Sequence, residues 1–272
     1  MSCRTRAISV PVPGRLSRAI LFGAIVAFSA QAAWAEAFDD IKAEGRIRVA
    51  IAVGTPLFSF ADASGQLTGS DVETARRLAT DLGVKLEVVP VTNAARIPTL
   101  QSGKVDIVVA DLAITPERAK TIDFSPPYAA LTLIVAAPKS ATVKGYADLA
   151  GKQVGVTRAT VNDTLTSQNA KDAEIVRVED DATLIALAVA GKIDAFSSIP
   201  PSLGEVVKRA PDVGWERKFD QQDFLLGIAM NKQQPKLKAW IDDWVATNLK
   251  NGSLDDIFRK YHGQHLPAAV RP

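Results

Sequence analysis

Short apolar runs alternate with amphipathic segments along the first half of the chain. Three runs rich in β-branched residues indicate buried strands: IRVAIAV (47–53), KLEVVPV (85–91) and VDIVVA (105–110). Between the first two, apolar residues recur with helical spacing from Val72 to Leu82, and Gly83 ends the helix. Strands that alternate with helices are typical of a parallel-rich α/β architecture.

The second half of the chain repeats this cycle. Strand-like runs KQVGV, EIVRV and IDAFSS surround a helix over residues 182–190 that stops at Gly191. The letters repeat as well, because LQSGKVDIVVAD (100–111) matches AVAGKIDAFSSI (188–199) around a shared Gly-Lys-Val/Ile-Asp. One such match could be chance, but its place in both cycles favours two similar lobes.

The C-terminal segment departs from the cycle. A strand over 224–230 (FLLGIAM) precedes two helices, over 235–249 and 254–261. These elements suggest that the chain crosses back to the first lobe. We therefore expect an α/β fold of two lobes joined by two hinge strands, with a ligand cleft between them. The boundaries would be 36–128 and 226–272 for lobe 1, 132–222 for lobe 2, and a hinge near 128–132 and 222–226.

The N-terminal segment has the pattern of a secretory signal peptide. Four arginines precede an apolar run over 19–30, and Ala33-Trp34-Ala35 forms an A-x-A cleavage site. The alternative, a membrane anchor, is disfavoured because a spanning helix needs about 20 apolar residues. Cleavage after residue 35 would place the protein in the periplasm.

Cleavage changes the charge and the cysteine content. It removes four of the 32 basic residues and none of the 30 acidic ones, so the formal charge falls from +2 to −2. The basic character thus belongs to the export signal, and we expect no nucleic-acid partner. The only cysteine, Cys3, is removed as well, which excludes a thiol enzyme.

Arg118 is the most informative candidate site residue. Thr115 suits a helix N-cap and Pro116 the first helical position, so Arg118 falls in the first turn. The helix dipole disfavours a cation there unless an anion is bound beside it. A guanidinium also grips a carboxylate with two hydrogen bonds. The alternative is a surface ion pair of Arg118 with Glu117 or Asp123.

A second helix start offers a matching anion site. The loop Thr157-Arg158-Ala159-Thr160 leads from a strand into a helix. Clefts beyond the carboxyl ends of strands are where open α/β sheets usually bind ligands, so the two helix starts could hold one carboxylate. Simple capping by Thr160 is the alternative.

The order and content of several segments resemble the extracellular solute-binding proteins of family 3, the polar amino-acid receptors of bacterial ABC importers. The most specific element is T-x-E-R-x-x-x-x-D-F-S-x-P-Y, over 115–128. Further similar segments are PLFSFADASGQLTGSDVETARRLATDLG, YADLAGKQVGVTRAT and GIAMNKQQPKLKAW. The resemblance covers nearly the whole chain after residue 35. It implies hinge closure on a small solute and delivery to an ABC transporter permease, with the receptor acting as a monomer.

The resemblance also implies a ligand site. Arg118 would hold the ligand carboxylate near the backbone of Ala110 and Asp111, and Thr160 and Val161 would add N–H donors. The side-chain pocket would be lined by Thr55, Asn93, Ala113, Thr157 and Ser198.

The chain departs from the family pattern at specificity positions. Ile199 stands where a carboxylate usually meets the ligand ammonium, and Ala113 replaces a hydroxyl residue. Thr55 and Asn93 occupy the positions of aromatic side chains, and Ala159 replaces a glycine. Either Asp111 takes over the ammonium, or the ligand lacks an α-amino group. Asp111 could instead accept a bond from Arg118 and have only a structural role.

An enzyme is the alternative function. Cyclohexadienyl dehydratases resemble this family and need a general acid in the same cleft, for which Asp111 is the best candidate. No paired-carboxylate motif supports this, so we expect a protein without catalytic residues. The only histidines, His262 and His265, lack further ligands nearby in the sequence, and no phosphate loop is present. We expect neither a metal nor a cofactor.

Overall fold

The computed structural model describes residues 36–271, and the expected signal peptide (1–35) lies outside them. Two five-stranded sheets form the framework. The first has the order β4-β1-β5-β12-β6, formed by Lys85–Val91, Arg46–Ala52, Ile107–Val108, Ala229–Asn231 and Ile122–Phe124. The second has the order β11-β7-β10-β8-β9, formed by Trp215–Leu226, Ala129–Pro138, Ala195–Ser198, Gln153–Thr157 and Glu174–Val178. A small hairpin joins β2 (Phe60–Ala61) to β3 (Leu67–Thr68).

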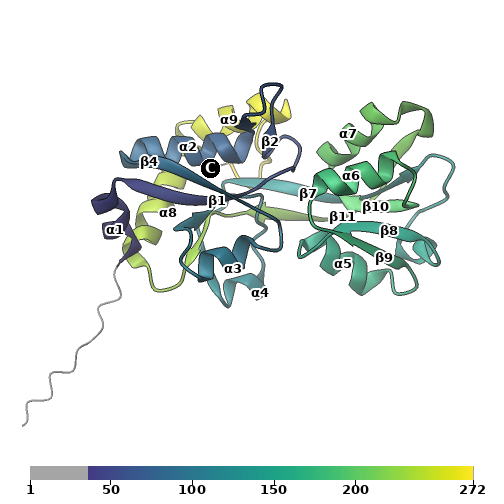
Figure 1. Ribbon diagram of the computed structural model, residues 1–272, viewed down its shortest axis with the longest axis horizontal. Coiled ribbons are helices and arrows are strands. Elements are labelled where there is room, and N and C mark those ends of the chain that lie inside the picture. The colour runs from purple at the N-terminus through teal and green to yellow at the C-terminus, as the bar shows by residue number, and fades with distance from the viewer. Residues whose placement is uncertain (1–35, 272) are drawn as a thin grey trace, which may run out of the picture. The chain divides into compact units, whose positions relative to one another are not determined.

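Each sheet carries its own set of helices (Figure 1). Around the first sheet lie α1 (Ala37–Glu44), α2 (Ser70–Leu82), α3 (Arg96–Gln101), α4 (Pro116–Ala119), α8 (Pro235–Lys250) and α9 (Ser253–His262). Around the second lie α5 (Val161–Asn169), α6 (Asp181–Val189) and α7 (Pro200–Arg209), with 3-10 turns at Tyr146–Leu149 and Pro211–Val213. The expected α/β fold is confirmed, although the sequence pattern did not predict α1 or α7.

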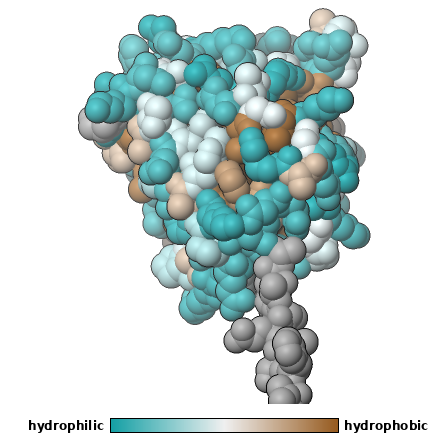
Figure 2. Space-filling model, turned by 90° about the vertical axis from the view of Figure 1, so that its left-hand side faces the viewer, coloured by the Kyte–Doolittle hydropathy of each residue, from teal (hydrophilic) through white to brown (hydrophobic). Residues whose placement is uncertain are grey.

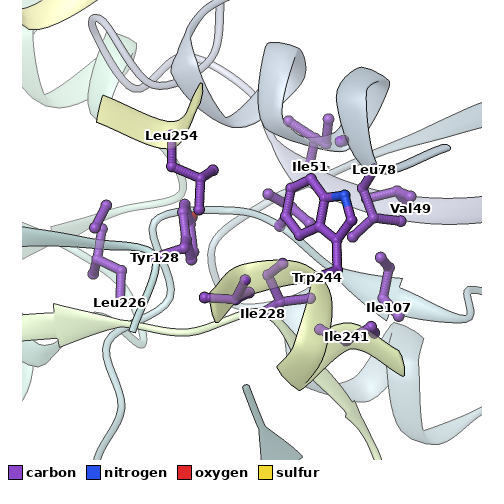
Figure 3. Packing of buried hydrophobic residues seen from close by; sticks show 14 of the residues in the cluster. Val49, Ile51, Leu78, Ile107, Tyr128, Leu226, Ile228, Ile241, Trp244 and Leu254 are labelled. Atoms are coloured by element: carbon purple, nitrogen blue, oxygen red, sulfur yellow. The ribbon is translucent and has the colours of Figure 1, made fainter. Parts of the chain in front are cut away.

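Strand β1 shows how the sequence pattern builds the core of the first sheet. Its alternate residues Ile47, Val49 and Ile51 pack with α2, α8 and α9, whereas Ala50 and Ala52 face the side of α3. Figure 3 shows Trp244 of α8 beside Ile241, near Val49, Ile51 and Leu78. Because both faces of the sheet are covered, the central strand β1 is buried and apolar from Val49 to Ala52. One outer side of the molecule is in contrast largely polar, with a smaller apolar area within it (Figure 2).

The repeated Gly-Lys-Val/Ile-Asp motif has the same role in both sheets. Asp106 accepts the Arg48 N–H through Oδ2 at 2.7 Å, and Asp194 accepts the Gln153 N–H in the same way at 2.8 Å. The N–H groups of the two aspartates donate back to the carbonyls of those same residues. Each motif thus fixes the register between a strand and its parallel neighbour, β1 in one sheet and β8 in the other. The expected internal repeat is confirmed.

The expected strand over 224–230 is divided between the two sheets, so this prediction was wrong in detail. β11 pairs with β7 up to Leu226, and β12 begins at Ala229 in the first sheet. Gly227 lies at the crossing, where a Cβ would meet side-chain carbons of Ile114 and Phe124 at 2.9 Å. A glycine here lets the chain pass close to its neighbours.

Strands β7 and β11 form the long connection between the two sheets (Figure 1). They pair antiparallel from Ala129 with Leu226 to Thr132 with Asp223 at the end nearest the first sheet. We propose that the hinge lies there, near 128–132 and 222–226, and that it separates 36–128 with 226–272 from 132–222. None of the helices within residues 36–271 combines the length and the apolar character that a membrane span requires.

Candidate functional site

A small cavity lies where the connections of the two sheets meet. Its volume is about 20 Å³, on the order of one water molecule. The first sheet contributes Arg96, Asp111, Ala113 and Arg118, and β7 contributes Leu131 and Leu133. The connections of the second sheet contribute Thr160, Val161, Asn162, Asp181, Ser198 and Ile199. Six residues proposed from the sequence therefore line one cavity: Asp111, Ala113, Arg118, Thr160, Val161 and Ser198.

Arg118 spans the gap between the two sides of this cavity. Thr115 caps α4, as the sequence predicted, by accepting the Arg118 N–H at 3.3 Å. The guanidinium donates to the carbonyl of Ala113 at 2.9 Å and to that of Ala159, on the opposite side, at 3.2 Å. Burial, together with the nearby positive charge of Arg96, lowers the pKa of Arg118 to about 9. Burial at this site thus disfavours the charged form of the Arg118 guanidinium.

The alternative of a surface ion pair for Arg118 is wrong. Lys120 donates to Glu117 at 2.7 Å, and Lys232 donates to Asp123 at 3.0 Å. Both carboxylates thus have lysine partners on the surface. The only acceptors of the Arg118 guanidinium among residues 36–271 are the two backbone carbonyls.

Asp111 pairs with a different arginine from the one we considered. Arg96 is almost fully buried and donates to Asp111 Oδ1 at 3.3 Å. It also donates to the carbonyls of Asn93 and Ala110, each at 2.9 Å. Arg118 therefore does not form the hydrogen bond to Asp111 that we considered from the sequence. No sequence motif identified Arg96, although it starts a helix that follows the carboxyl end of β4.

The backbone of Asp111 is held by a second buried acid. Asp111 has a left-handed conformation (φ 42°), and its N–H donates to Asp71 Oδ2 at 2.7 Å. Tyr128 donates its hydroxyl to the other oxygen of Asp71, also at 2.7 Å. Burial raises the pKa of Asp71 to about 7 and that of Asp111 to about 8, although Arg96 opposes both shifts. This network orients Asp111 towards Arg96.

Asp181 is a second charged cavity residue, after Arg96, that sequence reasoning missed. It is the first residue of α6, directly after the N-cap Asp180, and is 7% exposed. Its carboxylate accepts bonds from Thr157 Oγ1 at 2.9 Å, Ser198 Oγ at 3.4 Å and, from the other sheet, Thr55 Oγ1 at 3.1 Å. Burial raises its pKa. Its place beyond the carboxyl end of β9 was the signal that could have found it.

The remaining predicted residues lie around these charged groups. Thr55 and Thr157 are buried and contact the cavity through Asp181. Asn93 and Ala110 are buried, and their carbonyls accept from Arg96. Thr160 caps α5 by accepting the Asp163 N–H at 3.2 Å, as its alternative role predicted. Ile199 is 5% exposed, so this position of the cavity wall is apolar.

Comparisons with known proteins place this chain in a family. The model of the bacterial extracellular solute-binding proteins, family 3, matches residues 47–264. The L-cystine-binding protein TcyJ of Escherichia coli K12 is 30% identical over 227 residues, 82% of this chain and 85% of that protein.

Solved structures agree with this match. A mutant of ArgBP from T. maritima has a TM-score of 0.79 and 28% identity, covering 84% of this chain and all of that one. An ancestral amino acid-binding protein, described as a precursor of cyclohexadienyl dehydratase, has a TM-score of 0.76 and 33% identity, covering 82% and 98%. The two-lobed fold expected from the sequence is confirmed, and the chain belongs to the bacterial extracellular solute-binding proteins of family 3.

Proposed function

We propose that this protein captures a small, carboxylate-bearing, amino-acid-like solute in the periplasm and delivers it to an ABC transporter permease. The observation that carries the proposal is the position of Arg118. Its guanidinium lies in a buried cavity and reaches a carbonyl of each lobe, Ala113 at 2.9 Å and Ala159 at 3.2 Å. The cystine-binding and arginine-binding names of its relatives support an amino-acid-like solute.

A ligand carboxylate has donors on both sides of the cavity. Arg118 would bind it with two charge-assisted hydrogen bonds, which are about twice as strong as neutral ones. The first turn of α5, at Val161 and Asn162, adds N–H groups of the kind that have no partner within a helix. A carboxylate would also offset the low pKa of Arg118, because an anion stabilises the charged guanidinium.

Binding would be coupled to closure of the two lobes about β7 and β11. Two hydrogen bonds link the lobes directly, from Arg118 to the Ala159 carbonyl and from Thr55 to Asp181. A solute that contacts both lobes at once stabilises the closed form over the open one, which is the condition for a population shift. The permease would then recognise the closed form.

The other residues would shape the pocket around the solute. Ala113, Leu131 and Ile199 give it apolar walls. We assign Thr55, Asn93, Thr157 and Ser198 to the side-chain pocket, and the backbone of Ala110 and Asp111 to the carboxylate end. A small cavity that combines these apolar walls with charged and hydroxyl groups favours a compact solute with polar ends over a large apolar one.

A thermal-shift panel tests the proposal. The purified protein is unfolded and refolded to remove co-purified solute, then screened against the standard amino acids, cystine, simple carboxylic acids, amines and prephenate. A solute at 100 times its Kd should add about 2.7 kcal/mol, a rise of several degrees for a domain of this size. Shifts by carboxylates and none by amines support the proposal. An absence of carboxylate shifts, or conversion of prephenate, overturns it.

A further inference from the structure

The carboxylate of Asp181 is buried in the cavity and forms no ion pair within residues 36–271, although the charge of Arg96 is near enough to oppose the rise of its pKa. Within residues 36–271 its three hydrogen-bond partners are all hydroxyls, those of Thr55, Thr157 and Ser198. Buried carboxylates are normally paired, because removing a charge from water is costly. Asp181 therefore has the surroundings of a group that completes its interactions only when a cation is bound.

The other two acids near the cavity are less suited to bind a ligand cation. Asp111 has an ionic partner in Arg96, at 3.3 Å. Asp71 accepts the Tyr128 hydroxyl and the Asp111 N–H, one on each oxygen, and is not part of the cavity wall. Of the acids that line the cavity, Asp181 is thus the one that a ligand cation can neutralise.

The hydrogen bonds of Asp181 leave room for one more donor. An ionised carboxylate has about four lone-pair sites. Thr157 and Ser198, from the same lobe, both donate to Oδ1, whereas Oδ2 accepts, among residues 36–271, only the Thr55 hydroxyl from the opposite lobe. Oδ2 is therefore the oxygen that faces the other lobe and can accept a further N–H.

Asp181 and Arg118 meet the same cavity from opposite lobes. Because the cavity has a volume of about 20 Å³, on the order of one water molecule, the lobes must move apart to admit a solute between these two groups. An α-amino acid carries its carboxylate and its ammonium one carbon apart, so one molecule can reach both groups. It would take the place of the two bonds that now link the lobes, from Arg118 to Ala159 and from Thr55 to Asp181.

On the basis of the proposed function, we propose that Asp181 binds the α-ammonium of the solute. The protein thereby selects zwitterionic amino acids over simple carboxylic acids. The solute then connects a cation of lobe 1 to an anion of lobe 2. Closure depends on both charges of the ligand rather than on its carboxylate alone.

Matched ligand pairs test this assignment by calorimetry. Each pair shares a carboxylate and a side chain and differs in the α-ammonium: L-arginine with 5-guanidinopentanoic acid, L-cysteine with 3-mercaptopropanoic acid, L-glutamine with glutaramic acid, and L-alanine with propanoic acid. Further pairs are built from any amino acid that shifts the melting temperature. The wild-type protein should bind the amino acid about 30-fold or more tightly than its partner, because leaving a buried charge unpaired is costly.

Two variants separate the role of Asp181 from a general loss of charge. Asp181→Asn should remove the preference for the amino acid and leave the affinity for the desamino acid within about threefold, since that ligand has no α-ammonium to lose a contact. Asp180→Asn is the matched control, because it removes the same charge from the same helix start and keeps a good N-cap. It should retain the wild-type preference.

The possible outcomes distinguish this inference from the proposed function. Equal wild-type affinity for both members of every pair overturns the role of Asp181, even if Asp181→Asn fails to fold. A preference that survives in folded Asp181→Asn also overturns it. In both cases the proposed function stands if carboxylates bind and Arg118→Ala abolishes their binding. If no carboxylate binds the wild-type protein, the proposed function fails and the inference fails with it.

Discussion

Arg96 Nη1 lies 3.3 Å from Asp111 Oδ1, which makes Arg96 the ionic partner of Asp111. The side chain of Arg96 is 3% exposed and that of Asp111 12%. The pair occupies the lobe-1 side of the cavity and leaves the Arg118 guanidinium bonded only to backbone carbonyls in the described residues. One arginine therefore supports the site and the other is available to a ligand.

Arg96→Met should destabilise the fold strongly. Removing one partner of a buried ion pair leaves an uncompensated charge, which costs about 3–5 kcal/mol. Denaturant unfolding above pH 8, where Asp111 is ionised, measures the loss. Arg46→Met is the control, because Arg46 pairs with Glu44 and Glu87 on the surface and should matter little. A loss for Arg96→Met no larger than that of the control would contradict the role of the pair.

The contribution of Asp71 and Asp111 to stability should fall as the pH rises from about 4 to about 8. Burial raises the pKa of Asp71 to about 7 and that of Asp111 to about 8, far above the unfolded value of 3.8. In this window these two groups bind more protons in the folded state than in the unfolded state, so their contribution to the free energy of unfolding decreases with pH. Unfolding midpoints at several pH values measure this. Asp111→Asn should flatten the decrease, and an unchanged slope in that variant would contradict it.

Protonation of His262 should change stability with pH in the opposite direction, between about pH 4 and pH 6.5. Its ring stacks on Phe258 at 4.0 Å, and burial lowers its pKa to about 4 from 6.5. At this site the unfolded state therefore binds more protons between these values, and the contribution of His262 to stability, up to roughly 3 kcal/mol, is lost as the pH falls through them. His262→Phe keeps a stacking ring and should reduce this loss. An acid-side loss equal to that of the wild type would refute the assignment.

Gly227→Ala should destabilise the crossing between the two sheets. The new Cβ would lie 2.9 Å from side-chain carbons of Ile114 and Phe124. Overpacking of this kind costs typically about 1–3 kcal/mol. Gly145→Ala is the control, because no atom lies within 4 Å of the position that a Cβ would take there. Thermal unfolding of both variants decides the point, and equal melting temperatures would show that the close approach does not matter.

The fold could be predicted from the sequence because its signals are local. Strand runs such as 47–53 and helix stops such as Gly83 follow from short-range pattern, and the Gly-Lys-Val/Ile-Asp repeat marks the same strand pair in both sheets. The division of 224–230 between two sheets was missed, because an unbroken apolar run carries no mark of which sheet each residue joins.

The site could be predicted only in part. Arg118 and Thr160 stand at helix starts with recognisable capping residues, so their positions followed from the sequence. The partners of Asp111 and Asp181 come from residues 15 to 126 positions away, such as Arg96 and Thr55. Pairings over such distances depend on tertiary packing, which the periodicity of a single segment does not encode.

Calorimetric titration of Arg118→Ala tests the central claim most directly. The titrants are the amino acid that binds the wild-type protein and its carboxamide, which lacks the anionic carboxylate. Arg158→Ala is the control, since Arg158 forms an exposed pair with Glu179. We predict that Arg118→Ala lowers the affinity for the amino acid by about 100-fold or more. The wild-type protein should bind the carboxamide more weakly than the amino acid by a similar factor. The control variant should bind the amino acid with wild-type affinity. Wild-type affinity in Arg118→Ala would contradict the account.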